Sequence, residues 1–332
     1  MAAASDTAGG LYETTPEQPI AIGISSCLLG EAVRFDGNHK HDSWITSELG
    51  QFFTFRPVCP EVAIGLGVPR EPIRLTGDVN APRVTGTRDP ALDVTDKLEN
   101  YGRRMATELG PDISGYILKA RSPSCGMERV PVYTGERGGV ERKGIGAYAR
   151  TLMASAPLLP VEEEGRLHDP VLRENFIERV FAFRRWQDLI RGGVSRGRLV
   201  DFHTAHKLTL MSHGAVQMRE LGRLVADLGK RPIREAAEEY GRHFMAALTR
   251  RATRRRHTDV LMHLSGYLKR QLDSADRQEL REIIEAYRLG HVPLIVPITL
   301  LQHHFRRHPD DFVARQVYLQ PHPGELRLRN GI

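Results

Sequence analysis

Each of the three cysteines in this chain follows a short apolar segment with the character of a buried strand. The segments are 21–24 before Cys27, 52–58 before Cys59 and 113–118 before Cys125. Gly, Pro or Ser lies next to every cysteine, which is typical of places where strands end. The carboxyl ends of parallel strands meet at one edge of an open α/β sheet, where such folds bind ligands. We therefore predict that the fold brings the three thiols together at one sheet edge.

Three convergent thiolates are a ligand set for a metal ion or an iron–sulfur cluster, with one position left open for chemistry. The C-x-x-C pair typical of zinc sites is absent, yet the residues alone leave zinc and iron–sulfur both open. A lone cysteine is most often a small buried hydrophobic residue. A disulfide would leave one thiol over, and a Cys/His nucleophile would use only one of the three. The loop settings and wide spacing favour three ligands.

Strand-like and helix-like segments alternate through residues 19–161, which predicts an α/β domain. Besides the strands before the cysteines, helices are expected at residues 41–50, 95–109 and 144–154. We expect a Rossmann-like domain of three layers with a mostly parallel sheet. The small, polar and acidic residues 1–18 are interpreted as a disordered leader and not as a signal peptide.

Beyond Glu162–Gly165, which is interpreted as a polar linker, the periodicity becomes helical. We expect an all-α domain over residues 166–332. Its predicted helices are 169–192, 198–212, 215–227, 233–252, 254–268, 273–289, 294–304 and 310–318.

The net charge of +6 is unevenly distributed. Residues 1–160 carry 17 Lys and Arg against 19 Asp and Glu, whereas residues 161–332 carry 30 against 22. This asymmetry indicates a reaction module joined to an anion-binding module, although a solvated basic surface would explain it equally well. No run approaches the ~18 apolar residues of a membrane span. Reduced cysteines and the absence of an export signal predict a cytoplasmic protein.

Several motifs of the first part closely resemble the thiouracil desulfidase (TudS) family. They are Ser25-Ser26-Cys27-Leu28-Leu29-Gly30, Arg34-Phe35-Asp36-Gly37, Val58-Cys59-Pro60-Glu61-Val62, Asp93-Val94-Thr95 and Lys119-Ala120-Arg121-Ser122-Pro123-Ser124-Cys125-Gly126. The resemblance implies that Cys27, Cys59 and Cys125 hold a [4Fe-4S] cluster and leave one iron without a protein ligand. It also implies that sulfur of a thiolated uracil binds that iron and that water replaces it with no net redox change.

The second part resembles the all-α domain often fused to this one, with hallmarks at residues 202–208, 219–224, 261–269 and 321–326. The two-domain arrangement is similar to the RudS type of desulfidase, which converts 4-thiouridine in tRNA to uridine. The resemblance implies tRNA and the iron–sulfur assembly machinery as partners.

Glu61 lies two residues after Cys59 and is the expected general acid/base. The alternative is that Glu61 caps the next turn. By its position in the family motif, Ser122 matches a serine important for catalysis. Ser124 is expected to bind substrate or to serve as a supporting turn residue.

Phosphate contacts are expected from basic residues in both parts. Arg121 and Lys119 are predicted to meet substrate phosphate, with a surface salt bridge as the equal alternative. Arg254, Arg255 and Arg256 form the densest basic run of the second part and are predicted to neutralise tRNA phosphates.

The expected function is therefore a [4Fe-4S]-dependent, non-redox desulfidase acting on thiolated uracil, with 4-thiouridine in tRNA as the expected substrate. One alternative is a desulfidase of free thiouracil. Another is a metal-stabilised RNA-binding protein without turnover.

Overall fold

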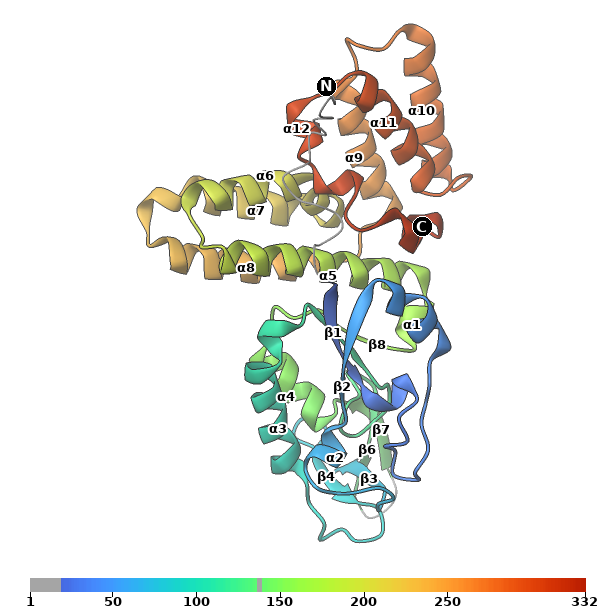
Figure 1. Cartoon of the computed structure of the whole chain (residues 1–332), viewed down its shortest axis with the longest axis vertical. Helices are drawn as coiled ribbons and strands as arrows, with labels where there is room; N and C mark the ends of the chain where they lie inside the picture. The colour runs from blue at the N-terminus through green and yellow to red at the C-terminus, as the bar shows by residue number, and fades with distance from the viewer. Residues whose placement is uncertain (1–18, 136–138) are drawn as a thin grey trace, which may run out of the picture. The chain divides into compact units, whose positions relative to one another are not determined.

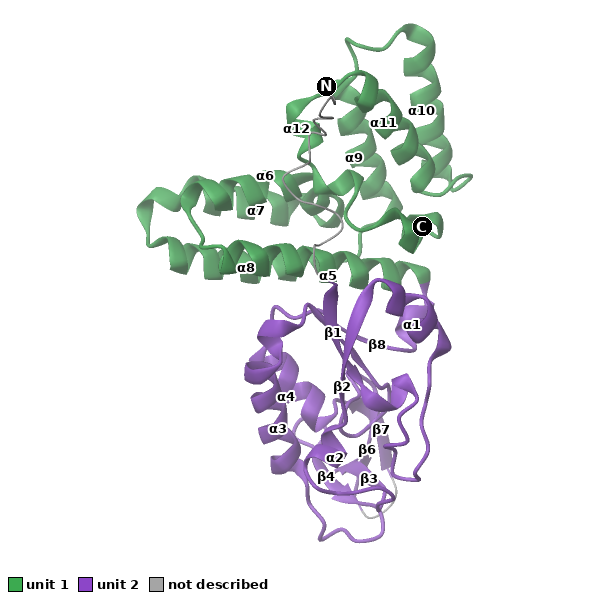
Figure 2. Cartoon of the chain, in the orientation of Figure 1, with its two compact units in different colours: residues 1–17, 170–332 green, residues 18–169 purple. Residues whose placement is uncertain are grey.

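The computed structural model describes residues 19–135 and 139–332 (Figure 1). The predicted disordered leader, residues 1–18, lies outside the described residues. The described chain forms two compact units that meet in the sequence between Asp169 and Pro170 (Figure 2). We call them the α/β unit and the helical unit.

The α/β unit is built on a four-stranded, fully parallel sheet with the order β2-β1-β5-β8. The strands are β1 (Ile20–Ser25), β2 (Phe53–Val58), β5 (Gly115–Leu118) and β8 (Val161–Glu163). Every residue of β1 and β5 is buried, as expected for central strands covered on both faces. The predicted parallel α/β fold is confirmed.

The helices of this unit include α1 (Ser43–Ser47), α2 (Pro60–Ala63), α3 (Thr95–Glu108) and α4 (Ala147–Ser155). Asp42 caps α1, because its Oδ1 accepts a hydrogen bond from the Ile45 N–H. α3 and α4 pack side by side along the sheet (Figure 1). Short 3₁₀ turns lie at Ser26–Leu29, Leu49–Gln51, Gly110–Asp112 and Arg166–His168.

A second, mixed four-stranded sheet was not predicted from the sequence. Its order is β4-β3-β6-β7, with β3 (Ile73–Thr76), β4 (Arg83–Gly86), β6 (Val130–Thr134) and β7 (Gly139–Gly144). Its buried residues Leu75, Val84 and Val132 form one core with Leu98 of α3. These strands are short and separated by Gly- and Pro-rich turns, so their apolar periodicity is weak.

The interpretation of Glu162–Gly165 as a linker was wrong. Glu162 and Glu163 belong to β8 and are buried, and β8 pairs with β5. Glu163 Oε1 accepts the Met127 N–H at 2.7 Å, and Glu162 Oε1 accepts from Arg166 Nε at 2.6 Å. Two consecutive carboxylates are suited to a strand here because each has a partner in a neighbouring segment.

The helical unit consists of helices and 3₁₀ turns in its described residues. The helices are α5 (Pro170–Arg191), α6 (Arg196–His213), α7 (Ala215–Ala226), α8 (Ile233–Leu248), α9 (Arg254–Tyr267), α10 (Ser274–Leu289), α11 (Ile295–Arg307) and α12 (Asp311–Ala314). The turns are Leu228–Lys230, Val317–Leu319, Gly324–Leu326 and Leu328–Asn330. The predicted helices are confirmed, except that the last is a single turn of α-helix followed by the 3₁₀ turn at Val317–Leu319.

Trp186 is buried in this unit and stacks on Tyr240 at 5.7 Å between ring centroids, so it belongs to the core. Within the described residues, no helix is both long enough and apolar enough to cross a membrane.

Candidate functional site

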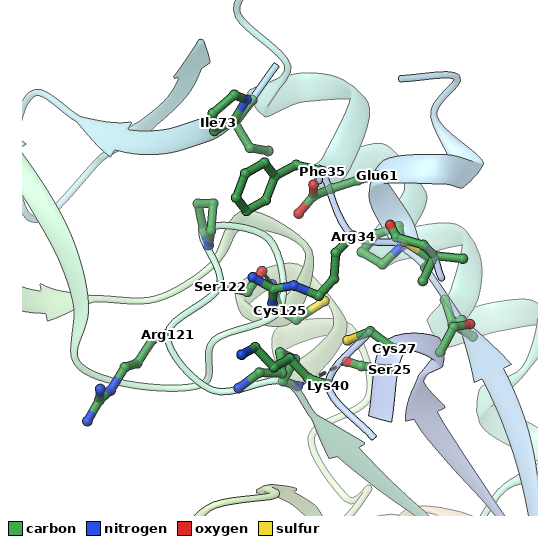
Figure 3. A pocket seen from close by; sticks show the side chains of 18 of the residues that line it. Ser25, Cys27, Arg34, Phe35, Lys40, Glu61, Ile73, Arg121, Ser122 and Cys125 are labelled. Carbon is green, nitrogen blue, oxygen red and sulfur yellow. Dashed lines mark hydrogen bonds between the residues drawn. The ribbon is translucent and has the colours of Figure 1, made fainter. Parts of the chain in front are cut away.

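A pocket of about 350 Å³ opens at the carboxyl edge of the parallel sheet. All three cysteines line it, together with Glu61 and Ser122 (Figure 3). In the figure the sulfur atoms of Cys27 and Cys125 face the same space. The structure therefore brings the three thiols together with Glu61 and Ser122, as expected from the sequence.

The ends of two neighbouring strands place the first two thiols. Ser25 of β1 lies beside Val58 of β2 in the parallel register. Cys27 follows in the 3₁₀ turn after β1, and Cys59 is the residue before α2, with Pro60 at the first helical position. Proline there costs no hydrogen bond, because the first N–H groups of a helix have no intrahelical partner.

The third thiol lies on a loop, residues 122–126, that rests on the start of α4. The backbone N–H groups of Ala147 and Ala149 donate to the carbonyls of Pro123 and Ser124, both at 3.0 Å. A Cβ atom on Gly146 would come within 2.4 Å of the Ser124 carbonyl oxygen, so this close approach requires glycine. The loop is thus fixed before any ligand is bound.

Burial governs the protonation of the thiols. It raises the pKa of Cys27 to about 11, against an opposing effect of the Lys119 charge. Burial also raises the pKa of Cys59 and, with the neighbouring Glu61 charge, that of Cys125. Thiols in such surroundings ionise readily only when a cationic ligand takes up the negative charge. The donor set and its enclosure therefore fit a soft metal centre.

Within the described residues, no three His, Cys, Asp or Glu side chains lie close enough to hold one metal ion. Three thiolates on a cubane cluster bind three different iron atoms, so they do not need to meet at one ion.

Side chains hold both carboxylate oxygens of Glu61. Oε1 accepts a hydrogen bond from Ser124 Oγ at 2.8 Å, and Oε2 accepts from Arg70 Nε at 2.9 Å. Only 14% of the Glu61 side chain and 6% of the Arg70 side chain are exposed. These contacts differ from those of a helix cap, which bonds to nearby backbone N–H groups. The partners of Glu61 are side chains 9 and 63 residues away.

The two serines of the loop have different positions. Ser122 lines the pocket, and its Oγ accepts hydrogen bonds from the Ser124 N–H at 3.2 Å and the Cys125 N–H at 3.1 Å. Its hydroxyl proton is left to donate toward the pocket. Ser124 is fully buried behind the pocket, where its hydroxyl orients Glu61. Ser124 is thus placed to position Glu61 and not to touch substrate.

The structure separates Lys119 from Arg121. Lys119 forms an ion pair with Glu164 and donates to the Ala120 carbonyl at 3.1 Å, which matches the salt-bridge alternative. Arg121 is exposed, has a positive φ of 62°, and points away from the other labelled side chains in Figure 3. Of these two residues, Arg121 is the one available to a phosphate outside the pocket.

Sequence reasoning assigned no role to Arg34, Phe35 or Lys40, which also line the pocket. Arg34 and Phe35 stand in the Arg-Phe-Asp-Gly motif between the first two cysteines. That motif was the available signal, but its residues have no local feature that reveals where the side chains point.

In the helical unit, the three predicted RNA-binding arginines differ. Arg254 Nη1 donates to the Tyr287 carbonyl at 3.1 Å, and its guanidinium lies 5.3 Å from the Tyr287 ring centroid. Arg256 Nη1 donates to the His213 carbonyl at 2.9 Å. Arg255 is exposed, and no hydrogen bond or ion pair engages its side chain within the described residues. Two of the three therefore join segments of the fold.

Comparison with known proteins finds two family models on the chain. Residues 22–164 match the model of 2-thiouracil desulfurase, and residues 207–323 match a domain described as a protein of unknown function, DUF1722.

Two curated relatives are also similar. The uncharacterized protein YbgA of Escherichia coli K12 is 33% identical over 153 residues, which is 46% of this chain and 90% of YbgA. The uncharacterized protein YbbK of Bacillus subtilis 168 is 31% identical over 134 residues, which is 39% of this chain and 87% of YbbK.

A solved structure, that of the [4Fe-4S]-dependent thiouracil desulfidase TudS, is 31% identical to the matched part. It covers 45% of this chain and 93% of its own, with a TM-score of 0.37.

Proposed function

Because the chain belongs to the 2-thiouracil desulfurase family, we propose that it removes sulfur from a thiolated uracil at a [4Fe-4S] cluster held by Cys27, Cys59 and Cys125. The observation that carries this proposal is the shared lining of one pocket by the three thiols, Glu61 and Ser122. The enclosed thiols can hold the cluster that binds sulfur. The carboxylate beside them, fixed by its hydrogen bonds, can activate water.

When bound, the cluster would supply an iron without a protein ligand, a Lewis acid suited to the soft sulfur of a thiocarbonyl. The chain's own residues provide the proton transfers. Glu61, held by Arg70 and Ser124, accepts a proton from the attacking water. Ser122 is placed to donate a hydrogen bond to a polar edge of the base.

The reaction balances as a hydrolysis. One C–O bond forms from water, the C–S bond breaks, and the sulfur leaves as sulfide with its electron pair. The two protons of water end on the carboxylate and on the sulfide, and no oxidant or reductant is needed.

For the substrate, we propose 4-thiouridine in tRNA, with the helical unit binding the RNA. The excess of Lys and Arg after residue 160 and the unengaged Arg255 support an interaction with phosphates. Arg121, which points outward from the pocket, would contact a phosphate next to the reacting nucleotide. A free thiouracil would need none of these charges. We propose a reducing cytoplasmic location, where an assembly machinery delivers the cluster.

The decisive experiment is anaerobic incubation of cluster-loaded protein with bulk bacterial tRNA and, in parallel, with free 4-thiouracil. Sulfide and the nucleoside content of the tRNA are measured. Conversion of 4-thiouridine to uridine supports the proposal. Conversion of the free base alone favours the free-thiouracil alternative, and tRNA binding without sulfide release would leave an RNA-binding protein without turnover.

A further inference from the structure

The pocket is lined by five cationic residues whose surroundings differ. Arg70 is paired with Glu61 and Lys119 with Glu164, so their charges are neutralised within the protein. Arg121 points outward. Arg34 and Lys40 remain, and Figure 3 shows Arg34 reaching across the pocket toward Ser122 and Cys125.

The backbone on both sides of Arg34 is anchored. Arg70 donates from Nη2 to the Val33 carbonyl and from its backbone N–H to the Phe35 carbonyl, both at 2.9 Å. A turn closes on the other side, where the Gly37 N–H donates to the Arg34 carbonyl at 2.9 Å. The residue that holds Glu61 therefore also holds the segment that carries Arg34, so the arginine is presented to the pocket in a defined position.

The guanidinium of Arg34 lies 5.6 Å from the Phe35 ring centroid, but the side chain makes no hydrogen bond within the described residues. Its Nε is shut off from solvent and makes no hydrogen bond within the described residues. Asp36 is its ion-pair partner at 3.7 Å, a separation too long for a hydrogen bond. The Nη donors of Arg34 also make no hydrogen bond within the described residues. Because 24% of the side chain is exposed and it lines the pocket, these Nη donors are the ones that an acceptor on a bound ligand can reach.

The chemistry of the pyrimidine identifies that acceptor. A uracil with sulfur at C2 or C4 keeps one carbonyl oxygen at the other position, whereas 2-thiocytosine carries an amino group there. A guanidinium has donors only, so it pairs with the carbonyl oxygen and repels the amino group. Phe35, 37% exposed at the pocket, offers an aromatic ring on which the base can stack.

We propose that Arg34 reads the carbonyl group that remains on the thiolated pyrimidine and thereby selects thiouracil over thiocytosine; this inference rests on the proposed function. Arg34 acts in substrate recognition, whereas Glu61 acts on water. A site built to hydrogen-bond a substrate group discriminates strongly against an analogue that leaves its donors unpaired.

The test measures binding, so that it does not depend on turnover. Glu61→Gln suppresses the reaction, and equilibrium dialysis of this cluster-loaded variant gives the affinities for 2-thiouracil and 2-thiocytosine. We expect 2-thiouracil to bind at least about tenfold more tightly. Adding Arg34→Met to this variant should remove most of that preference, because the binding of 2-thiouracil becomes weaker. Arg34→Lys in its place should restore part of the preference. Arg142→Met, which changes an exposed residue of β7 outside the pocket, is the matched control.

Iron content and cluster absorption are recorded for every variant. An unchanged preference after Arg34→Met overturns the inference. A loss of iron with the preference intact would instead assign Arg34 to the cluster and also overturn it. Failure of the proposed function would be seen in a different measurement, because the unmodified protein would then release no sulfide from thiouracil.

Discussion

Arg70 Nη2 lies 2.8 Å from Glu61 Oε2 in an ion pair that is almost closed off from solvent. Ser124 completes this arrangement from the other side of the carboxylate at 2.8 Å. Hydrogen bonds to a charged group are worth more than neutral ones, and removal of one partner leaves the other buried without compensation. The position of the Glu61 carboxylate thus depends on residues that do not themselves react.

Arg70→Met should lower kcat by about 10²-fold with a smaller effect on KM, because Glu61 loses its orientation while the thiols stay in place. Arg70→Lys should recover part of kcat, since it restores the charge without the two-pronged geometry. Steady-state kinetics with matched iron content check this. Equal losses of iron and activity in both variants would show that Arg70 is needed for the fold of the site instead.

The two loop serines should separate in their effects. Ser124→Ala removes one hydrogen bond to Glu61, a contribution of ~1 kcal/mol, and should lower kcat about fivefold with full cluster content. Ser122→Ala also removes the acceptor for the Cys125 N–H, so we expect a larger loss of kcat. Iron analysis and kinetics of both variants provide the comparison, and a harmless Ser122→Ala would contradict the placement of this hydroxyl toward the substrate.

Each of Cys27→Ser, Cys59→Ser and Cys125→Ser should lose most of the cluster iron and the activity together. Removing one thiolate leaves a second iron without a protein ligand, and the cluster then loses iron to the solvent more easily. Iron and sulfide content, with the absorption of the anaerobically purified protein, are the measurements. Glu61→Ala is the control that should keep the iron, and any cysteine variant with normal iron and turnover would remove that residue from the ligand set.

Replacement of Arg255 should affect RNA binding alone. Arg255→Ala is expected to weaken tRNA binding and to reduce by about 1 the slope of log affinity against log salt concentration. Arg254→Ala loses the hydrogen bond to the Tyr287 carbonyl and should instead lower the free energy of unfolding by about 1 kcal/mol. Binding titrations at several salt concentrations test the effect of Arg255→Ala, and thermal melts test the effect of Arg254→Ala. Unchanged binding by Arg255→Ala would place the RNA contacts elsewhere.

A buried ionic network in the helical unit predicts how its stability depends on pH. Burial opposes ionisation of Glu178, but the hydrogen bond from His213, at 3.0 Å, lowers the Glu178 pKa to about 2. Burial and the Glu178 charge raise the pKa of the neighbouring Glu174 to about 7, against the opposing charge of Arg329. The ordinary pKa of both carboxyls is about 4.3.

The two carboxyls act on stability in opposite directions. The contribution of Glu178 is present above its ordinary pKa and is lost as pH falls toward 2. The contribution of Glu174 is present below its ordinary pKa and is lost as pH rises through 7. We expect Glu174→Gln to gain melting temperature relative to the unmodified protein as pH rises from 5 to 7, because the variant lacks the carboxyl whose ionisation opposes folding. Thermal unfolding of both proteins from pH 5 to pH 8 measures this difference, and a difference that does not change with pH would contradict the assignment.

Local sequence patterns were enough to predict the parallel sheet, the helices and the positions of the three cysteines at strand ends. Period-two and period-3.6 patterns arise from burial of one face, so α3 was predicted to within one residue of Thr95–Glu108. That the thiols gather at one edge of the sheet then follows from the rule that the carboxyl ends of parallel strands meet there, whereas the strand order came only from the structure.

The partners of the polar side chains were decided only by the tertiary structure. Ser124 and Glu61 are 63 residues apart, and Lys119 and Glu164 are 45 apart. No local pattern encodes such pairs, because they depend on how loops from different strands meet. For the same reason the acidic run at Glu162–Glu164 resembled a linker, although its carboxylates bind the loops behind the site. The sequence by itself thus determined which residues stand at the edge of the sheet, whereas the packing of the loops decided which of their charges are neutralised and which, like Arg34, face the pocket.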